Sequence, residues 1–212
     1  MALGSVHARV VIIDTGTANT GSVINMLRQL GVEPVVSANR GELETAERLL
    51  LPGVGAFDVG MRGLADGGLV ETLKERVEAG VPLLGVCLGM QLLFCGSEEG
   101  SSPGLGLIPG MVRRLPVISK VGPVRVPHMG WSRLERRTDH PLLEGLEDEA
   151  RFYFVHSYAA VPLHEDHVVS VSVHGNPFVS VVARGNVAGV QFHPEKSHRF
   201  GKALLSNYLS NF

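Results

Sequence analysis

The chain has 212 residues, of which 44% are hydrophobic and 19% charged, and its formal net charge is −2. This composition fits a single globular domain with a sizeable core. Two cysteines without CxxC spacing exclude a disulfide framework and a zinc knuckle. Because the sequence has no basic tract and no apolar run of membrane-spanning length, we expect neither nucleic acid nor a membrane as a partner.

The first residues, 1–7, lack the basic and apolar pattern of a secretory signal. Unpaired cysteines also suit a reducing compartment. We therefore expect the protein to be cytoplasmic.

The following part of the chain alternates between predicted strands and helices. Short apolar runs typical of buried strands occur at 9–14, 34–37 and 49–51. Apolar residues at helical spacing occur at 22–30, around Leu43 and at 69–79. This alternation predicts an α/β fold, with a mostly parallel central sheet and helices on both of its faces.

A loop containing two glycines follows the third predicted strand, at residues 52–57. Such a loop can expose backbone N–H groups to an anion. It is not a phosphate-binding P-loop, because no Gly-Lys-Ser/Thr follows. The alternative interpretation is an ordinary turn from a strand into a helix.

Cys87 lies where a predicted strand, 81–86, meets a predicted helix, 88–94. The surrounding Gly85-Val86-Cys87-Leu88-Gly89 has the G-x-nucleophile-x-G pattern of a strained elbow that presents a nucleophile at the end of a sheet. N–H groups at the start of a helix would stabilise a thiolate there. A lone cysteine is more often a small buried hydrophobe, and that interpretation is kept for Cys95, which has no such flanks.

The second half of the chain changes character after a loop rich in glycine, serine and proline at 98–110. Short predicted strands follow at 124–126, 151–155, 168–173 and 179–182, and residues 129–131 are predicted as loop. A last buried strand at 187–192 precedes a helix at 196–209. We therefore predict one domain, 1–212, with a smaller antiparallel region inserted in the parallel core and an N-terminal extension of about eight residues, 1–8.

His193 is the candidate base for a cysteine nucleophile, because it follows a buried strand as Cys87 does. Glu195 comes two residues later, so an extended backbone points both side chains the same way, and Pro194 favours that geometry at His193. The carboxylate can then orient the imidazole while the imidazole activates the thiol. Alone, His-x-Glu would more often be a surface pair.

An oxyanion also needs donors, and the candidates are the backbone N–H of Leu88 and one from the 52–55 loop, which we assign to Val54. Gln91 follows Cys87 by one helical turn and faces the same way, so its amide can bind a polar substrate group. An exposed helix position for Gln91 is the less attractive alternative, because residues 92–94 are apolar.

Residues 85–91 and Gln191-Phe192-His193-Pro194-Glu195 resemble the motifs of the class I, or triad-type, glutamine amidotransferases. The resemblance covers essentially the whole chain and implies a flavodoxin-like sheet. It also implies that Cys87 attacks the side-chain amide of glutamine to form a thioester and release ammonia, with no cofactor and no metal.

Further segments resemble the glutaminase subunits of imidazole glycerol-phosphate synthase, in histidine biosynthesis: 52–57, 127–131, 152–158 and 194–197. In that family a separate (β/α)8 cyclase subunit receives the ammonia, which implies a heterodimer. The resemblance assigns glutamine binding to Gly55, Gln91, Ser157 and Tyr158. It assigns the cyclase interface to Asn19, Met129, Trp131 and Lys196. Ser132 departs from the asparagine expected after the tryptophan.

Three alternatives stay open at this point. A free-standing cysteine hydrolase of similar topology would keep Cys87 and His193 but would have no use for the interface segments. The glutaminase subunit of another amidotransferase is a further alternative, although such glutaminases usually lack the Met-Gly-Trp and Glu-Lys-Ser segments. A binding module without activity has no reason to retain Cys87, His193 and Glu195 together.

Overall fold

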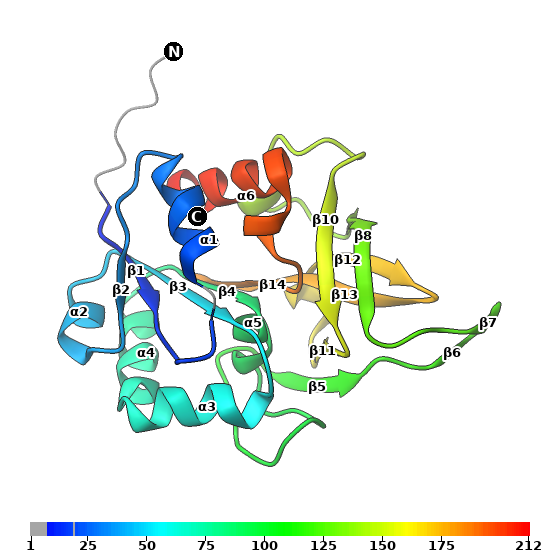
Figure 1. Ribbon diagram of the computed structural model, residues 1–212, viewed down its shortest axis with the longest axis horizontal. Coiled ribbons are helices and arrows are strands. Elements are labelled where there is room, and N and C mark those ends of the chain that lie inside the picture. The colour runs from blue at the N-terminus through cyan, green and yellow to red at the C-terminus, as the bar shows by residue number, and fades with distance from the viewer. Residues whose placement is uncertain (1–7, 19) are drawn as a thin grey trace.

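An eight-stranded sheet forms the centre of the protein in the computed structural model, which describes residues 8–18 and 20–212 (Figure 1). Its strands lie in the order β2 (Val35–Ser37), β1 (Val10–Ile13), β3 (Arg48–Gly53), β4 (Leu83–Cys87), β14 (Val187–Val190), β13 (Asn176–Arg184), β12 (Val168–His174) and β9 (Glu135–Arg136). The first five are parallel and the last three antiparallel. The predicted parallel core with an antiparallel addition is confirmed.

Helices cover both faces of the sheet, as predicted (Figure 1). One face carries α1 (Thr20–Arg28) and α6 (His198–Ser210), and the other carries α2 (Arg40–Glu44), α3 (Phe57–Asp66), α4 (Leu69–Glu78) and α5 (Leu88–Leu92). Successive side chains of a strand point to opposite faces of the sheet. In β1, Val10 and Ile12 therefore share a core with α1 and α6, and Val11 and Ile13 share the other core with α2 to α5. No helix within the described ranges is long and apolar enough to span a bilayer.

Three two-stranded sheets extend the antiparallel side of the molecule. They pair β8 (His128–Arg133) with β10 (Arg151–His156), β5 (Gly110–Arg114) with β11 (Tyr158–Pro162), and β6 (Ile118–Ser119) with β7 (Gly122–Pro123). Short 3-10 turns lie at η1 (Pro141–Leu143), η2 (Glu165–His167) and η3 (Pro194–Lys196). Phe152 and Phe154 of β10 join the same core as α1 and α6, which fixes β10 against the central sheet.

Two secondary-structure predictions in the second half, one of a strand and one of a loop, were wrong. Residues 124–126 form no strand, because the backbone of Val124 and that of Arg125 bond to separate partners, Val117 and His174, instead of to one neighbouring strand. Residues 129–131, predicted as loop, belong to β8, where pairing with β10 overrides the weak strand propensity of a segment that contains glycine.

Helix α3 was not predicted, because glycines at positions 60 and 63 lower its helix propensity. Close packing requires glycine at position 63 and leaves little room for a side chain at position 60. A Cβ atom on Gly63 would lie 2.2 Å from the backbone oxygen of Thr15, and one on Gly60 would lie 3.0 Å from a methyl carbon of Leu92. Pro52 and Gly53, predicted as loop, extend β3.

Candidate active site

The ends of three neighbouring parallel strands, β3, β4 and β14, form the candidate site. Cys87 is the last residue of β4 and is paired with Gly53, the last residue of β3. On the other side Val86 pairs with Val190 of β14, and the chain runs on from there to His193. Ligands of open parallel sheets bind at such carboxyl ends.

The predicted elbow is present at Cys87, whose backbone has φ 56° and ψ −111°, a strained conformation for a residue with a side chain. Helix α5 begins at the next residue, Leu88. The two flanking glycines permit this turn because the backbone passes very close to them. A Cβ on Gly89 would lie 1.7 Å from the backbone oxygen of Leu51, and one on Gly85 would lie 2.7 Å from the oxygen of Gly89.

We expect the substitution Gly89→Ala to lower the free energy of unfolding by roughly 3 kcal/mol or more, because the methyl group must push β3 and α5 apart in a buried layer. Denaturant unfolding measures this change. Gly41→Ala is the matched control, since Gly41 is exposed within α2 and should change stability by less than about 1 kcal/mol. Equal unfolding midpoints for Gly89→Ala and the parent would contradict the packing argument.

His193 is buried and is held from several sides. Its Nδ1 lies 2.7 Å from Oε1 of Glu195. Its backbone N–H donates to the oxygen of Tyr153 at 2.9 Å, and its carbonyl accepts from the hydroxyl of Ser197 at 2.6 Å. The remaining ring nitrogen, Nε2, is buried and has no hydrogen-bond partner among the described residues, which leaves it available to a reacting group.

The electrostatics of the site favour a protonated imidazole at His193. Burial lowers the pKa of the imidazole, but the neighbouring Cys87 sulfur and Glu195 carboxylate outweigh that effect and raise the pKa of His193 to about 9. The imidazolium can therefore give a proton to a leaving group at neutral pH.

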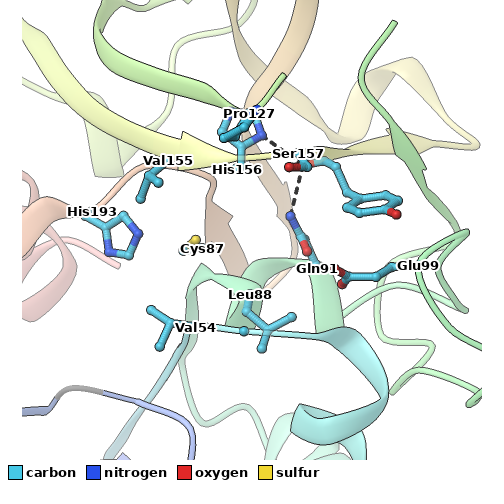
Figure 2. Close-up of a pocket in the computed structure, with 12 residues that line it drawn as sticks. Val54, Cys87, Leu88, Gln91, Glu99, Pro127, Val155, His156, Ser157 and His193 are labelled. Atoms are coloured by element: carbon cyan, nitrogen blue, oxygen red, sulfur yellow. Dashed lines mark hydrogen bonds between the residues drawn. The ribbon is translucent and has the colours of Figure 1, made fainter. Parts of the chain in front are cut away.

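A cavity of about 270 Å³ opens above Cys87 (Figure 2). Its lining includes most of the residues predicted for the site: Val54, Gly55, Cys87, Leu88, Gln91, Ser157, Tyr158 and His193. Figure 2 shows His193 and Gln91 on opposite sides of Cys87. Glu195 stands behind His193 and does not line the cavity.

Gln91 is buried, as its apolar neighbours predict, and its side-chain nitrogen makes two hydrogen bonds. One goes to the backbone oxygen of Tyr158 and the other to Oε1 of Gln191, both at 3.0 Å (Figure 2 shows the first). The nitrogen of Gln191 in turn lies 3.9 Å from the sulfur of Cys87. Sequence reasoning gave Gln191 no role, although a buried polar residue two positions before His193 was a usable signal.

Three residues of the predicted partner interface lie near one another on the surface. Trp131 meets the ring of Tyr153 edge-on at 5.7 Å, and the amine of Lys196 lies over that same ring at 5.7 Å. Met129 is 64% exposed and Trp131 45% exposed, two positions apart on β8. Asn19, also predicted for this interface, lies outside the described residues.

Cys95 differs from its prediction. It was expected to be a small buried hydrophobe but is an exposed free thiol beyond the end of α5. The helix stops at Leu92, and Cys95 is exposed although Leu93, Phe94 and Gly96 around it are buried.

Comparison with known proteins defines the class to which this fold and site belong. The family model described as glutamine amidotransferase class-I matches residues 11–212. The chain therefore belongs to the class I glutamine amidotransferases.

Sequence relatives narrow the class to imidazole glycerol phosphate synthase subunits of the HisH type. The chain is 50% identical over 200 residues to subunit HisH of Geobacillus kaustophilus, with 93% of this chain and 94% of the relative aligned. It is 46% identical over 201 residues to subunit HisH 2 of Pseudomonas aeruginosa, with 94% and 98% aligned. The fold is also that of the solved structure titled PurLQS from Thermotoga maritima, with a TM-score of 0.73, 21% identity and coverage of 95% of this chain and 97% of that one.

Proposed function

We propose that this chain is the glutaminase subunit of an imidazole glycerol phosphate synthase. It hydrolyses glutamine to glutamate and ammonia and passes the ammonia to a separate cyclase subunit, in histidine biosynthesis. The observation that carries the proposal is the meeting of Cys87 and His193 at the ends of adjacent strands, with Glu195 on the second ring nitrogen at 2.7 Å. Identity of 45–50% to HisH subunits supports the assignment to that synthase.

The first half-reaction forms a thioester. His193 holds the shared proton on Nε2, and the thiolate of Cys87 attacks the side-chain amide carbon of glutamine. The oxyanion that forms is stabilised by the backbone N–H groups of Leu88 and Val54. His193 then protonates the amide nitrogen, the C–N bond breaks and ammonia leaves, while Glu195 keeps Nδ1 protonated and the ring oriented.

The second half-reaction releases glutamate. Water enters the cavity, His193 takes one of its protons, and the hydroxide attacks the thioester carbon. The C–S bond breaks, Cys87 leaves as a thiolate while His193 keeps the proton taken from water, and the enzyme is regenerated. All protons move between His193, the entering water and the substrate, so the cycle needs no cofactor.

Glutamine binding is assigned to Gly55, Gln91, Ser157 and Tyr158, which line one cavity with Cys87. A cavity of about 270 Å³ is large enough for a single amino acid such as glutamine.

The partner of this chain in the proposal is a (β/α)8 cyclase subunit, bound as a heterodimer in the cytoplasm. We assign Met129, Trp131 and Lys196 to the interface, together with Asn19. An exposed tryptophan beside an exposed methionine is unusual on a free surface, and tryptophan is a frequent interface anchor. Lys196 directly follows Glu195, so an ion pair made by Lys196 can reach the triad through one residue.

Partner control is tested by measuring glutamine hydrolysis for the chain alone, with cyclase, and with cyclase plus its nucleotide substrate. We expect the parent rate to rise on the order of 10- to 100-fold when the complete system is present, and Lys196→Ala to lose most of that rise. Lys74→Ala on α4, a helix that does not contribute to the cavity, is the matched lysine control. An unchanged parent rate under all three conditions would favour a free-standing hydrolase, and no hydrolysis at all would favour a binding module.

A further inference from the structure

Two buried histidines meet edge-on behind the glutamine cavity. His156 ends β10 and His128 begins β8, and the two are directly opposite in the antiparallel register. They are 6% and 4% exposed, and Nδ1 of His128 lies 3.3 Å from Nε2 of His156. Phe154 and Phe178 pack against both rings. His156 also lines the cavity (Figure 2).

The direction of every hydrogen bond in this cluster follows from one carbonyl group. The backbone oxygen of Tyr158 can only accept, so Nδ1 of His156, 2.8 Å away, must donate to it. In a neutral ring Nε2 of His156 is then an acceptor, which makes Nδ1 of His128 the donor. Nε2 of His128 is in turn an acceptor, and it receives the hydroxyl proton of Ser132 at 3.2 Å. All three hydrogen bonds are therefore donated in the same direction, from Ser132 to His128, from His128 to His156, and from His156 to the Tyr158 carbonyl.

The same carbonyl also decides the orientation of Gln91. Because the Tyr158 oxygen is an acceptor, the Gln91 atom beside it must be the amide nitrogen, and the second hydrogen of that nitrogen goes to Oε1 of Gln191. The amide oxygen of Gln91 is thereby left to face the cavity as an acceptor. A flipped Gln91 would place its oxygen against two acceptor oxygens, which is unfavourable in a buried site.

We propose that Ser132, His128 and His156 are positioning residues for glutamine binding, which hold the Tyr158 carbonyl and so keep the acceptor oxygen of Gln91 directed at the substrate. This inference rests on the proposed glutaminase function. It assigns these residues no contact with the reacting amide, and therefore predicts an effect on the KM for glutamine rather than on the chemistry at Cys87.

The neutral state that this chain of donors requires is favoured by the surroundings. Burial and the neighbouring His174 lower the pKa of His128 to about 4. Burial lowers the pKa of His156 to about 3, although the hydrogen bond to the Tyr158 oxygen opposes this shift. Both rings are therefore neutral at pH 7, and each keeps one nitrogen whose lone pair can accept a hydrogen bond.

The test uses the complex with cyclase and compares KM and kcat for glutamine in the parent, His156→Phe and Ser132→Ala. We expect His156→Phe to raise KM roughly 10-fold and Ser132→Ala roughly 3-fold, with kcat nearly unchanged. Ser132→Asn should restore the parent KM, because its side-chain amide can still donate to His128. His164→Phe, at an exposed histidine away from the cavity, is the matched control.

Two further readouts separate positioning from general damage to the fold. The rate at which iodoacetamide alkylates Cys87, followed by peptide mass spectrometry, should stay within about two-fold of the parent, since this small reagent does not need Gln91. In a Gln91→Ala background, His156→Phe should add less than about two-fold to KM, because the residue acts through Gln91.

The outcomes separate this inference from the function on which it rests. A parent complex that does not hydrolyse glutamine overturns both. An active parent complex in which Ser132→Ala and His156→Phe leave KM unchanged, or add fully to Gln91→Ala, overturns the positioning role alone. If His156→Phe fails to fold, Ser132→Ala and Ser132→Asn still decide, because Ser132 lies at the partly exposed end of the chain of donors.

Discussion

Replacing Cys87 by alanine is expected to lower glutamine hydrolysis by about 10⁴-fold or more, as the loss of a triad nucleophile does. The reason is structural: the strained elbow holds this thiol at the end of β4, in the cavity that His193 also lines. Without the sulfur no thioester forms, and only binding and oxyanion stabilisation remain. Steady-state hydrolysis of glutamine by the complex with cyclase measures the loss.

Cys95→Ala is the matched control for that substitution and should leave the rate nearly unchanged. Cys95 is an exposed thiol, so it also provides a stringent test of selectivity. A glutamine-like electrophile should modify Cys87 despite its burial, because the cavity binds the reagent. An adduct found chiefly on Cys95 by mass spectrometry would contradict the assignment of Cys87 as the nucleophile.

Replacing Glu195 by glutamine is expected to lower the hydrolysis rate by roughly 10²- to 10⁴-fold while the protein stays folded. The carboxylate accepts the proton of His193 Nδ1 at 2.7 Å, and an amide can turn its NH₂ group toward the ring and favour the wrong tautomer. Removing the carboxylate also removes one of the effects that raise the pKa of His193. The alkaline limb of the rate profile, expected near pH 9 in the parent, should therefore move to lower pH.

The pH profile of kcat for the parent and Glu195→Gln, each in complex with cyclase, measures both effects. Glu165→Gln, at an exposed glutamate, is the control and should match the parent. Full activity in Glu195→Gln with an unmoved alkaline limb would mean that the group orienting His193 lies elsewhere.

The parallel half of the fold could be predicted from the sequence because its signals are local. Buried strands such as 9–14 and the helix at 69–79 show their apolar pattern without reference to any neighbour. The antiparallel half could not be predicted as well, because its strands depend on pairing across the chain. Residues 128–133 are a strand only because β10 lies beside them, and residues 124–126 have strand-like composition but no strand to pair with.

The candidate site shows the same division between features with a local sequence signal and features that depend on contacts across the chain. The elbow at Cys87 and the His-x-Glu pair are short patterns whose geometry follows from strand ends. Cys87 and His193 line the cavity, and Glu195 contacts the far nitrogen of the His193 ring. Two residues that contact them were missed: Gln191, beside the sulfur of Cys87, and Ser197, which donates to the carbonyl of His193. The buried pair His128 and His156 was also given no role. Gln191 contacts Cys87 across 104 positions of the sequence, and its position before His193 indicates burial but not that contact.

The transfer of nitrogen tests the central claim most directly. The chain, the cyclase and its nucleotide substrate are mixed with glutamine labelled with ¹⁵N in its side-chain amide, in an excess of unlabelled ammonium, and the imidazole product is analysed by mass spectrometry. Our account predicts that the product carries the label with the parent chain and with Cys95→Ala, and loses it with Cys87→Ala. A product that carries only unlabelled nitrogen with the parent chain would contradict the account, because the chain would then not supply ammonia from glutamine to its partner.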